Sequence, residues 1–244
     1  MSAFSCAPRR VFTSFLAVAL LLPAAALAGE AITQTKSTQA DMSPAEALEM
    51  LREGNQRFVD ENMLERDLID QVEATATGQY PFGVVLGCID SRVPPEIVLD
   101  QGIGDIFAPR VAGNFVNADI LGSMEFATAV AGSKVVVVLG HTSCGAVKGT
   151  ADQVELGNLT HTLSNIAPAM YSVEGHQGER NSKNAEFVQA VAEANVHHTV
   201  QNILDRSPVM KDLVDQGKLL VVGAMHDVAT GEVTWYEHDH HSSR

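Results

Sequence analysis

The sequence predicts a single α/β domain, in which a mainly parallel β-sheet of four strands carries a fifth strand at its edge and is flanked by helices. Short, valine-rich apolar runs alternate with segments of helical periodicity. An unbroken apolar run is typical of a strand buried on both faces, as in a parallel sheet. The β-α-β order favours parallel strands joined by right-handed crossovers. A chain of 244 residues, 45% of them hydrophobic, is sufficient for one such core.

The expected strands follow the apolar runs in order. The first covers 82–88, and the second, which is shorter, covers 105–110. The third, 134–140, contains four consecutive valines, and the fourth covers 219–224. Residues 233–236 are expected to form the edge strand. Because the sequence has neither an internal repeat nor a second domain boundary, we expect all of these strands in one sheet.

The first expected helix has a strong start signal. Ser43 is a good cap, Pro44 suits the first helical position, and Glu46 completes a capping box. Apolar residues then recur at helical spacing. Further helices are expected over 64–76, from Pro94, over 120–131 with Gly132 as the stop, from about Cys144, and over 182–204.

Residues 1–28 have the features of a secretory signal peptide. Two arginines precede the mostly apolar stretch Val11–Leu22, and a small-x-small cleavage site ends at Ala28. Twelve apolar residues are too few to span a bilayer, which argues against a membrane anchor. We therefore expect export across the inner membrane to the periplasm, and no membrane span in the mature chain.

The rest of the chain divides simply. We expect a flexible polar leader over 29–42, the α/β domain over 43–237 and a polar, His-rich tail over 238–244. The chain is acidic, with 30 Asp and Glu against 16 Lys and Arg and a net charge of −14. A nucleic-acid-binding surface is basic, so this charge argues against a nucleic-acid partner.

Metal-ligating residues follow two of the expected strands. Cys88 ends the first strand, and His141 and Cys144 come directly after the third. Carboxyl ends of parallel strands meet at one edge, so these side chains should gather there with Asp90 and Arg92. Two thiolates and an imidazole suit Zn²⁺, and a fourth, open position is typical of a catalytic zinc site.

A disulfide is the alternative for the two cysteines. Once Cys6 leaves with the signal peptide, Cys88 and Cys144 are the remaining cysteines, and an oxidising compartment favours a bond between them. The neighbouring Asp90, Arg92 and His141 favour zinc.

The pattern Cys88-x-Asp90-x-Arg92, followed by His141-x-x-Cys144, resembles that of β-class carbonic anhydrases. The likeness runs from about Ser43 to Tyr236, and it includes segments 54–58, 104–107 and 110–114. It implies one zinc per chain, held by Cys88, His141 and Cys144. It also implies that Asp90 accepts a hydrogen bond from zinc-bound hydroxide while Arg92 holds Asp90 off the metal. In a closed state, Asp90 itself takes the fourth zinc position.

The same resemblance implies a substrate site. Gln79 matches a glutamine that binds substrate, and the amide of Gly145 is a weaker candidate for the same role. Three further residues match positions of an apolar pocket for carbon dioxide, namely Phe107, Ala112 and Phe126. In the family the N-terminal helices pack across a dimer partner, so we expect a homodimer or a higher even oligomer. From the sequence alone these helices are equally able to cover their own sheet.

The resulting hypothesis is zinc-dependent, reversible hydration of carbon dioxide to bicarbonate and a proton. One alternative is a hydrolase of carbon disulfide or carbonyl sulfide on the same scaffold. Another is a non-catalytic protein that binds zinc or bicarbonate, although simple storage needs no Asp90–Arg92 pair. A third is a disulfide-stapled secreted module without metal.

Overall fold

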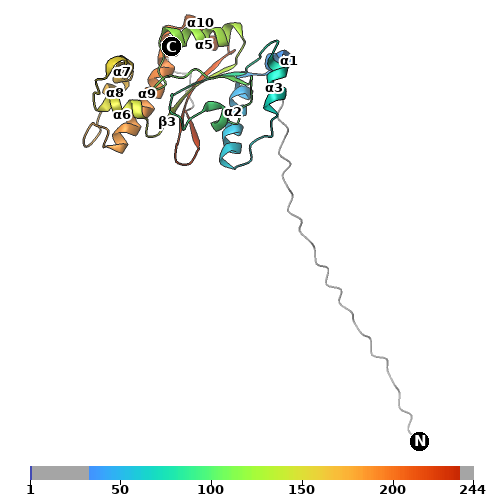
Figure 1. Cartoon of the computed structure of the whole chain (residues 1–244), viewed down its shortest axis with the longest axis horizontal. Coiled ribbons are helices and arrows are strands. Elements are labelled where there is room, and N and C mark those ends of the chain that lie inside the picture. The colour runs from blue at the N-terminus through green and yellow to red at the C-terminus, as the bar shows by residue number, and fades with distance from the viewer. Residues whose placement is uncertain (2–32, 237–244) are drawn as a thin grey trace.

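The computed structural model describes residue 1 and residues 33–236, so the expected signal peptide and His-rich tail lie outside the described residues. The described part contains a central sheet of five strands in the order β2-β1-β3-β4-β5 (Figure 1). The strands are β1 (Gly83–Gly87), β2 (Ile106–Phe107), β3 (Val135–His141), β4 (Leu220–His226) and β5 (Val233–Tyr236).

The sheet has the predicted topology. Strands β2, β1, β3 and β4 pair in parallel, and β5 pairs antiparallel with β4 at the edge. Two strand lengths differ from the prediction. β2 is only 106–107, because Pro109 has no N–H to continue a ladder. β4 extends beyond 224 to His226, which pairs in register with His141.

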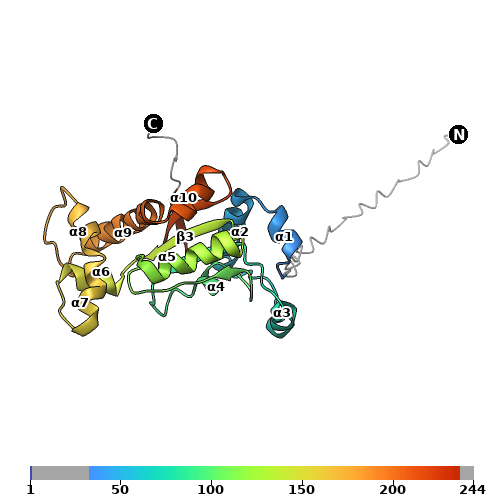
Figure 2. The same ribbon diagram turned by 90° about the horizontal axis from the view of Figure 1, so that it is seen from above.

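Helices cover both faces of the sheet (Figures 1 and 2). Side chains of β1 alternate, so Val84 and Leu86 enter one core cluster and Val85 enters the other. The first cluster lies under α5 (Ala118–Glu125), α9 (Ala185–Arg206) and α10 (Pro208–Asp215), whereas the second lies under α2 (Pro44–Val59), which is backed by α4 (Pro95–Val98).

The remaining helices lie at the two ends of the molecule (Figure 2). One end has α6 (Gly145–Ala151), α7 (Gly157–Ser164) and α8 (Ala167–Ser172), and the other has α1 (Lys36–Asp41) and α3 (Leu68–Thr75). No helix among the described residues is long and apolar enough to cross a membrane.

Helix α1 corrects one expectation. Residues 36–41 belong to the leader that we expected to be flexible, yet they form a helix with a capping box at Thr35. The buried side chain of Gln39 donates hydrogen bonds to the carbonyls of Pro81 (2.7 Å) and Ala131 (2.9 Å). The prediction was wrong here because one polar side chain finds distant backbone partners, which local composition does not reveal.

Helices α2 and α3 differ in how well local signals predicted them. α2 begins as expected, with Ser43 as the cap and a complete capping box. Its residues Ala47, Leu48 and Leu51 pack on the chain's own sheet. α3 begins at Leu68 rather than at 64, because the Asp67 side chain accepts from two backbone N–H groups and caps it there.

The helix expected over 120–131 is also more irregular than predicted. α5 ends at Glu125 and continues as a single π-helical segment, η1 (Phe126–Val130), before Gly132 at φ +87° stops it. A π-bulge adds a residue to the turn and shifts the following side chains. Phe126, the first residue of this segment, is 52% exposed.

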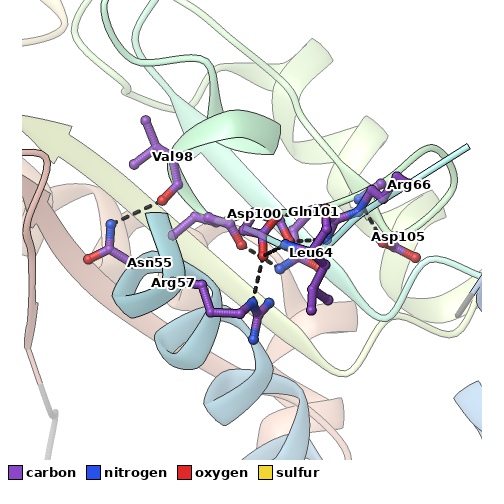
Figure 3. Close-up of polar contacts among 10 residues, drawn as sticks. Asn55, Arg57, Leu64, Arg66, Val98, Asp100, Gln101 and Asp105 are labelled. Carbon is purple, nitrogen blue, oxygen red and sulfur yellow. Dashed lines mark hydrogen bonds and ion pairs between the residues drawn. The ribbon is translucent and has the colours of Figure 1, made fainter. Parts of the chain in front are cut away.

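A buried carboxylate anchors the chain that follows α4 (Figure 3). Asp100 is fully buried, and its side chain forms ion pairs with both Arg57 of α2 and Arg66. It also accepts a hydrogen bond from the N–H of Leu64 at 3.2 Å. Two cations and one amide satisfy this charge, so the segment before α3 and the segment after α4 are fixed to α2.

Candidate metal centre

Three sulfur- and nitrogen-bearing side chains meet at the carboxyl ends of β1 and β3. The two strands pair up to Gly87 and Leu139, so the residues that follow leave the sheet at the same edge. Cys88 follows β1, His141 ends β3, and Cys144 is the N-cap of α6. Their ligand atoms all lie within 4.8 Å of one another, and all three residues are buried. The predicted gathering of these side chains is confirmed.

The orientation of His141 fits a metal ligand. Its Nδ1 donates to the carbonyl of Thr142 at 2.9 Å, which fixes the ring. Its Nε2 is buried and has no hydrogen-bond partner among the described residues. A buried ring nitrogen without a partner is costly, and a metal between this nitrogen and two thiols removes that cost.

The two thiols are free and electronically distinct. Cys88 and Cys144 are unpaired in the structure, so they do not form the disulfide of the alternative reading. A hydrogen bond from Cys144, aided by His141 and the Gly113 amide, lowers the pKa of Cys88 to about 4. The pKa of Cys144 is raised, because it donates to Cys88 and is buried. Metal binding requires cysteine ligands as thiolates, and these contacts favour the thiolate form of Cys88.

Asp90 and Arg92 form a tightly defined pair beside this cluster. Arg92 Nε and Nη2 donate to Asp90 Oδ1 (2.9 Å) and Oδ2 (2.8 Å), and the Arg92 amide donates to Oδ1 at 3.0 Å. These hydrogen bonds hold the pKa of Asp90 well below its usual range. Asp90 Oδ2 lies 3.9 Å from His141 Nε2. An ionised, acceptor-only carboxylate therefore lies next to the ligand atoms.

Two of the expected substrate residues lie at the cluster. Ala112 directly precedes Gly113, whose amide donates to Cys88 Sγ at 3.4 Å. Gly145 is the first residue of α6, directly after Cys144. The loop 111–114 and the start of α6 therefore border the space in front of the ligands.

Gln79 lies elsewhere. It precedes β1, at the amino end of the strand whose carboxyl end carries Cys88. A five-residue strand spans about 15 Å, so the Gln79 side chain cannot reach the cluster of its own chain. It lines a separate, polar pocket with Thr75 and Gly104.

Phe107 and Phe126 also lie apart from the ligands. Phe107 pairs in register with Val84, near the start of β1. The two phenylalanine rings contact edge to face, with centroids 6.3 Å apart. They line an open cleft of about 740 Å³ that includes none of the three candidate metal ligands. Within one chain, the expected substrate residues are thus divided among three places: the cluster, the polar pocket of Gln79 and the cleft of the two phenylalanines.

The structure adds residues that sequence reasoning missed. Arg110 was part of a matching segment without a role, and its guanidinium binds the backbone beside Cys88. Asn195 of α9 is buried, and it donates to the carbonyl of Gly113 at 2.8 Å. Asn195 lies four residues after buried Val191, and this helical spacing would have predicted that Asn195 is buried too. His226 is buried at the end of β4, and burial lowers its pKa to about 4.

Comparison with known proteins decides the family. The model of the carbonic anhydrase family matches residues 83–233. Carbonic anhydrase 2 of Mycobacterium tuberculosis is 34% identical over 204 residues, with 80% of this chain and 94% of that protein covered. The chain belongs to the carbonic anhydrase family.

Solved structures identify the class. A β-carbonic anhydrase of Aspergillus fumigatus has a TM-score of 0.60 at 27% identity, with 79% of this chain and 90% of that chain covered. One of two tetrameric β-carbonic anhydrases of Sordaria macrospora has a TM-score of 0.61 at 25% identity, with 68% and 85% covered. This β-class carbonic anhydrase is an enzyme that hydrates carbon dioxide, and neither a sulfur-gas hydrolase nor a binding protein is favoured.

Proposed function

We propose that Cys88, His141 and Cys144 hold one Zn²⁺ and that the hydration of carbon dioxide takes place in front of it. The unpartnered, buried Nε2 of His141 beside two free thiols is the observation that supports this site most directly. When bound, zinc supplies the nucleophile by lowering the pKa of a water molecule.

In this proposal, Asp90 orients the nucleophile. Oδ1 of Asp90 accepts two hydrogen bonds from Arg92, whereas Oδ2 accepts one and lies 3.9 Å from His141 Nε2. Oδ2 therefore keeps accepting capacity on the side of the ligands. Arg92 holds the carboxylate in place, so that the carboxylate accepts a hydrogen bond from the nucleophile instead of ligating the metal.

The proposed substrate site needs a second copy of the chain. Ala112 and the Gly145 amide border the metal position, but Gln79 and the pair Phe107–Phe126 lie towards the other end of β1. We infer that these residues serve the centre of a partner subunit in a homodimer or a higher even oligomer. Large apolar side chains exposed near them support this inference: Leu68, Ile69, Val72 and Val130.

We further propose that the domain, residues 43–237, is exported to the periplasm after cleavage following Ala28. Support comes from the basic start, the apolar stretch and the cleavage pattern of residues 1–28. Amino-terminal sequencing of protein recovered from the periplasm tests this. The expected first residue is Gly29, and an uncleaved chain retained in the cytoplasm would contradict the proposal.

Metal analysis with stopped-flow carbon dioxide hydration tests the centre. We expect one zinc per chain, and we expect both Cys144→Ser and His141→Ala to lose most of the metal and the activity. His161→Ala, which alters an exposed histidine, is the matched control and should retain both. A metal-free protein with a Cys88–Cys144 disulfide would refute the proposal. Turnover on carbon disulfide and carbonyl sulfide should be negligible beside that on carbon dioxide.

A further inference from the structure

The turn that carries Cys88 and Asp90 lies beyond the last paired residue of β1. β1 pairs with β3 only as far as Gly87, and on the other side a single bridge joins Gly87 to Arg110. Backbone bonds from Gly87 to Pro109 (3.0 Å) and from Val111 to Gly87 (3.1 Å) close this side of the ladder. Within the turn, the Val93 amide donates to the Asp90 carbonyl at 3.1 Å, but no neighbouring strand among the described residues supplies a donor to the carbonyls of Cys88 and Asp90. A donor from outside the turn is needed to tie these carbonyls to the rest of the structure.

The side chain of Arg110 is that donor. Its Nε donates to the carbonyl of Cys88 at 2.8 Å, and its Nη2 donates to the carbonyl of Asp90 at 2.7 Å. The two acceptors lie on either side of Ile89, where the chain bends, and both carbonyls face the same guanidinium. The planar fork of a guanidinium binds two such neighbouring acceptors at once, whereas a lysine ammonium is a point donor. The Arg110 side chain thus binds the backbone just beyond the point where the strand pairing ends.

We propose that Arg110 is a positioning residue for hydration: it fixes the main chain of residues 88–90 and thereby the place of the Asp90 carboxylate. This inference rests on the proposed roles of Cys88 and Asp90. Three groups hold Asp90: Arg110 and the Val93 amide bind its carbonyl, and Arg92 binds its carboxylate, but of these only Arg110 lies outside the turn. Without Arg110, the carboxylate loses its fixed position relative to His141 Nε2.

Metal binding depends less on Arg110 than turnover does. Cys88 directly follows β1, and its Sγ accepts from the Gly113 amide, so the ligand keeps other supports. We therefore expect variants to keep zinc and lose rate. Second-sphere groups of metal sites are typically worth about 10- to 100-fold in activity or metal affinity, and we expect the loss in kcat to fall in this range. KM should change little, because Arg110 positions Asp90 rather than the substrate.

The decisive variant is Arg110→Lys, which keeps the charge and removes the fork. Arg180 provides a matched control, since it also donates to two carbonyls, those of Val173 and Met170, far along the chain. Arg110→Lys should hold one zinc and lose kcat, and its cobalt-substituted form should have an altered visible absorption spectrum. Arg180→Lys should match the parent protein in all three measurements.

A second variant separates the fork from the charge. Arg110→Ala should lose turnover that millimolar guanidinium restores and methylammonium does not. Parental kcat and cobalt spectrum in Arg110→Lys would overturn the inference, and so would a loss of rate that only follows lost zinc or lost folded protein. The proposed function fails separately, if the parent protein itself has no zinc or no hydration activity.

Discussion

At the scale of single residues, neighbouring polar groups fix the chemistry of the centre. The Thr142 carbonyl sets the tautomer of His141, and Arg92 keeps Asp90 ionised and pointing in one direction. Neither effect needs a long side chain network. Each of these two effects comes from a partner within two positions in the sequence, and therefore a short sequence pattern was enough to predict the centre.

We expect Asp90→Asn to retain about one zinc per chain and to lose most of its turnover. Asparagine fills the same space, but a neutral amide, one end of which is a donor, does not accept a hydrogen bond from the nucleophile as an ionised carboxylate does. Metal analysis and stopped-flow hydration measure the two effects separately. Asp205→Asn, on the exposed side of α9, is the control and should leave both unchanged. An undiminished rate in Asp90→Asn would reduce Asp90 to a surface ion-pair partner.

His226 predicts how stability depends on pH. Burial, followed by the influence of His141, lowers the pKa of His226 from 6.5 to about 4. The unfolded chain therefore binds this proton below pH 6.5 while the folded chain does not, so stability falls as pH falls from 6.5 towards 4. The full effect is at most about 3 kcal/mol.

Urea unfolding of the zinc-loaded protein at pH 7 and pH 5.5 (about one unit below an ordinary histidine pKa) measures this dependence. His226→Gln should lose less stability between the two conditions than the parent, and His161→Gln should behave like the parent. Equal losses in the parent and in His226→Gln would show that His226 does not contribute.

At the scale of elements, α2 shows how a local signal and distant contacts combine. Its capping box sets the first turn, but its segment 54–58 acts through tertiary contacts. A side chain at Gly54 would collide with the carbonyl of Leu99. Asn55 connects three elements, because it donates to Val98 (3.0 Å) and Gly231 (2.9 Å) and accepts from Val233 (2.9 Å).

Asn55→Ala should lower the free energy of unfolding by about 2 to 4 kcal/mol, because it leaves several buried backbone groups without partners (Figure 3 shows the bond to Val98). Gln56→Ala is the neighbouring control, since Gln56 is exposed and bonds only to Asp60 within the helix; it should cost less than about 0.5 kcal/mol. Urea denaturation measures both values. Similar small costs for the two variants would mean that the Asn55 bonds are replaced by water.

At the scale of the whole molecule, the ligand cluster and Gln79 lie at different edges of one sheet. The ligands occupy the carboxyl edge, whereas Gln79 lies beyond the amino edge, near the exposed apolar side of α3. Such an arrangement favours assembly, because in an oligomer the Gln79 of one copy can reach the ligand cluster of another, and the contact covers the exposed apolar residues.

Light scattering at low micromolar concentration should therefore find a dimer or a higher even oligomer. Ile69→Lys, on the exposed side of α3, should weaken the assembly and the activity together. Val209→Lys changes another exposed apolar residue, on α10, and should leave the assembly and the activity unchanged. A stable, fully active monomer of the parent protein would contradict this prediction.

Mixing two inactive variants tests whether Gln79 acts across the interface. Cys144→Ser lacks zinc but retains Gln79, and Gln79→Ala retains zinc. In a mixed dimer, one centre then has both its metal and the Gln79 of the other subunit. Recovery of activity on mixing is the expected outcome, and no recovery, with mixed dimers present, would place the action of Gln79 elsewhere.

The sequence by itself determined the sheet and the ligand cluster. Apolar runs predicted β1, β3 and β4 within a few residues, because strands buried on both faces cannot tolerate polar positions. The edge strand β5 also lies where it was predicted. Cys88, His141 and Cys144 follow such strands directly, so strand topology alone brings them together.

Only the tertiary structure decided the rest, because it depends on contacts between residues far apart in the chain. Local composition made 29–42 a flexible leader, but Gln39 finds carbonyls 42 and 92 positions away and forms α1. A matching pattern placed Gln79 at the substrate, but the direction of β1 puts it at the opposite edge. Arg110 became more than part of a motif once the end of the β1 ladder left two carbonyls for its side chain to bind.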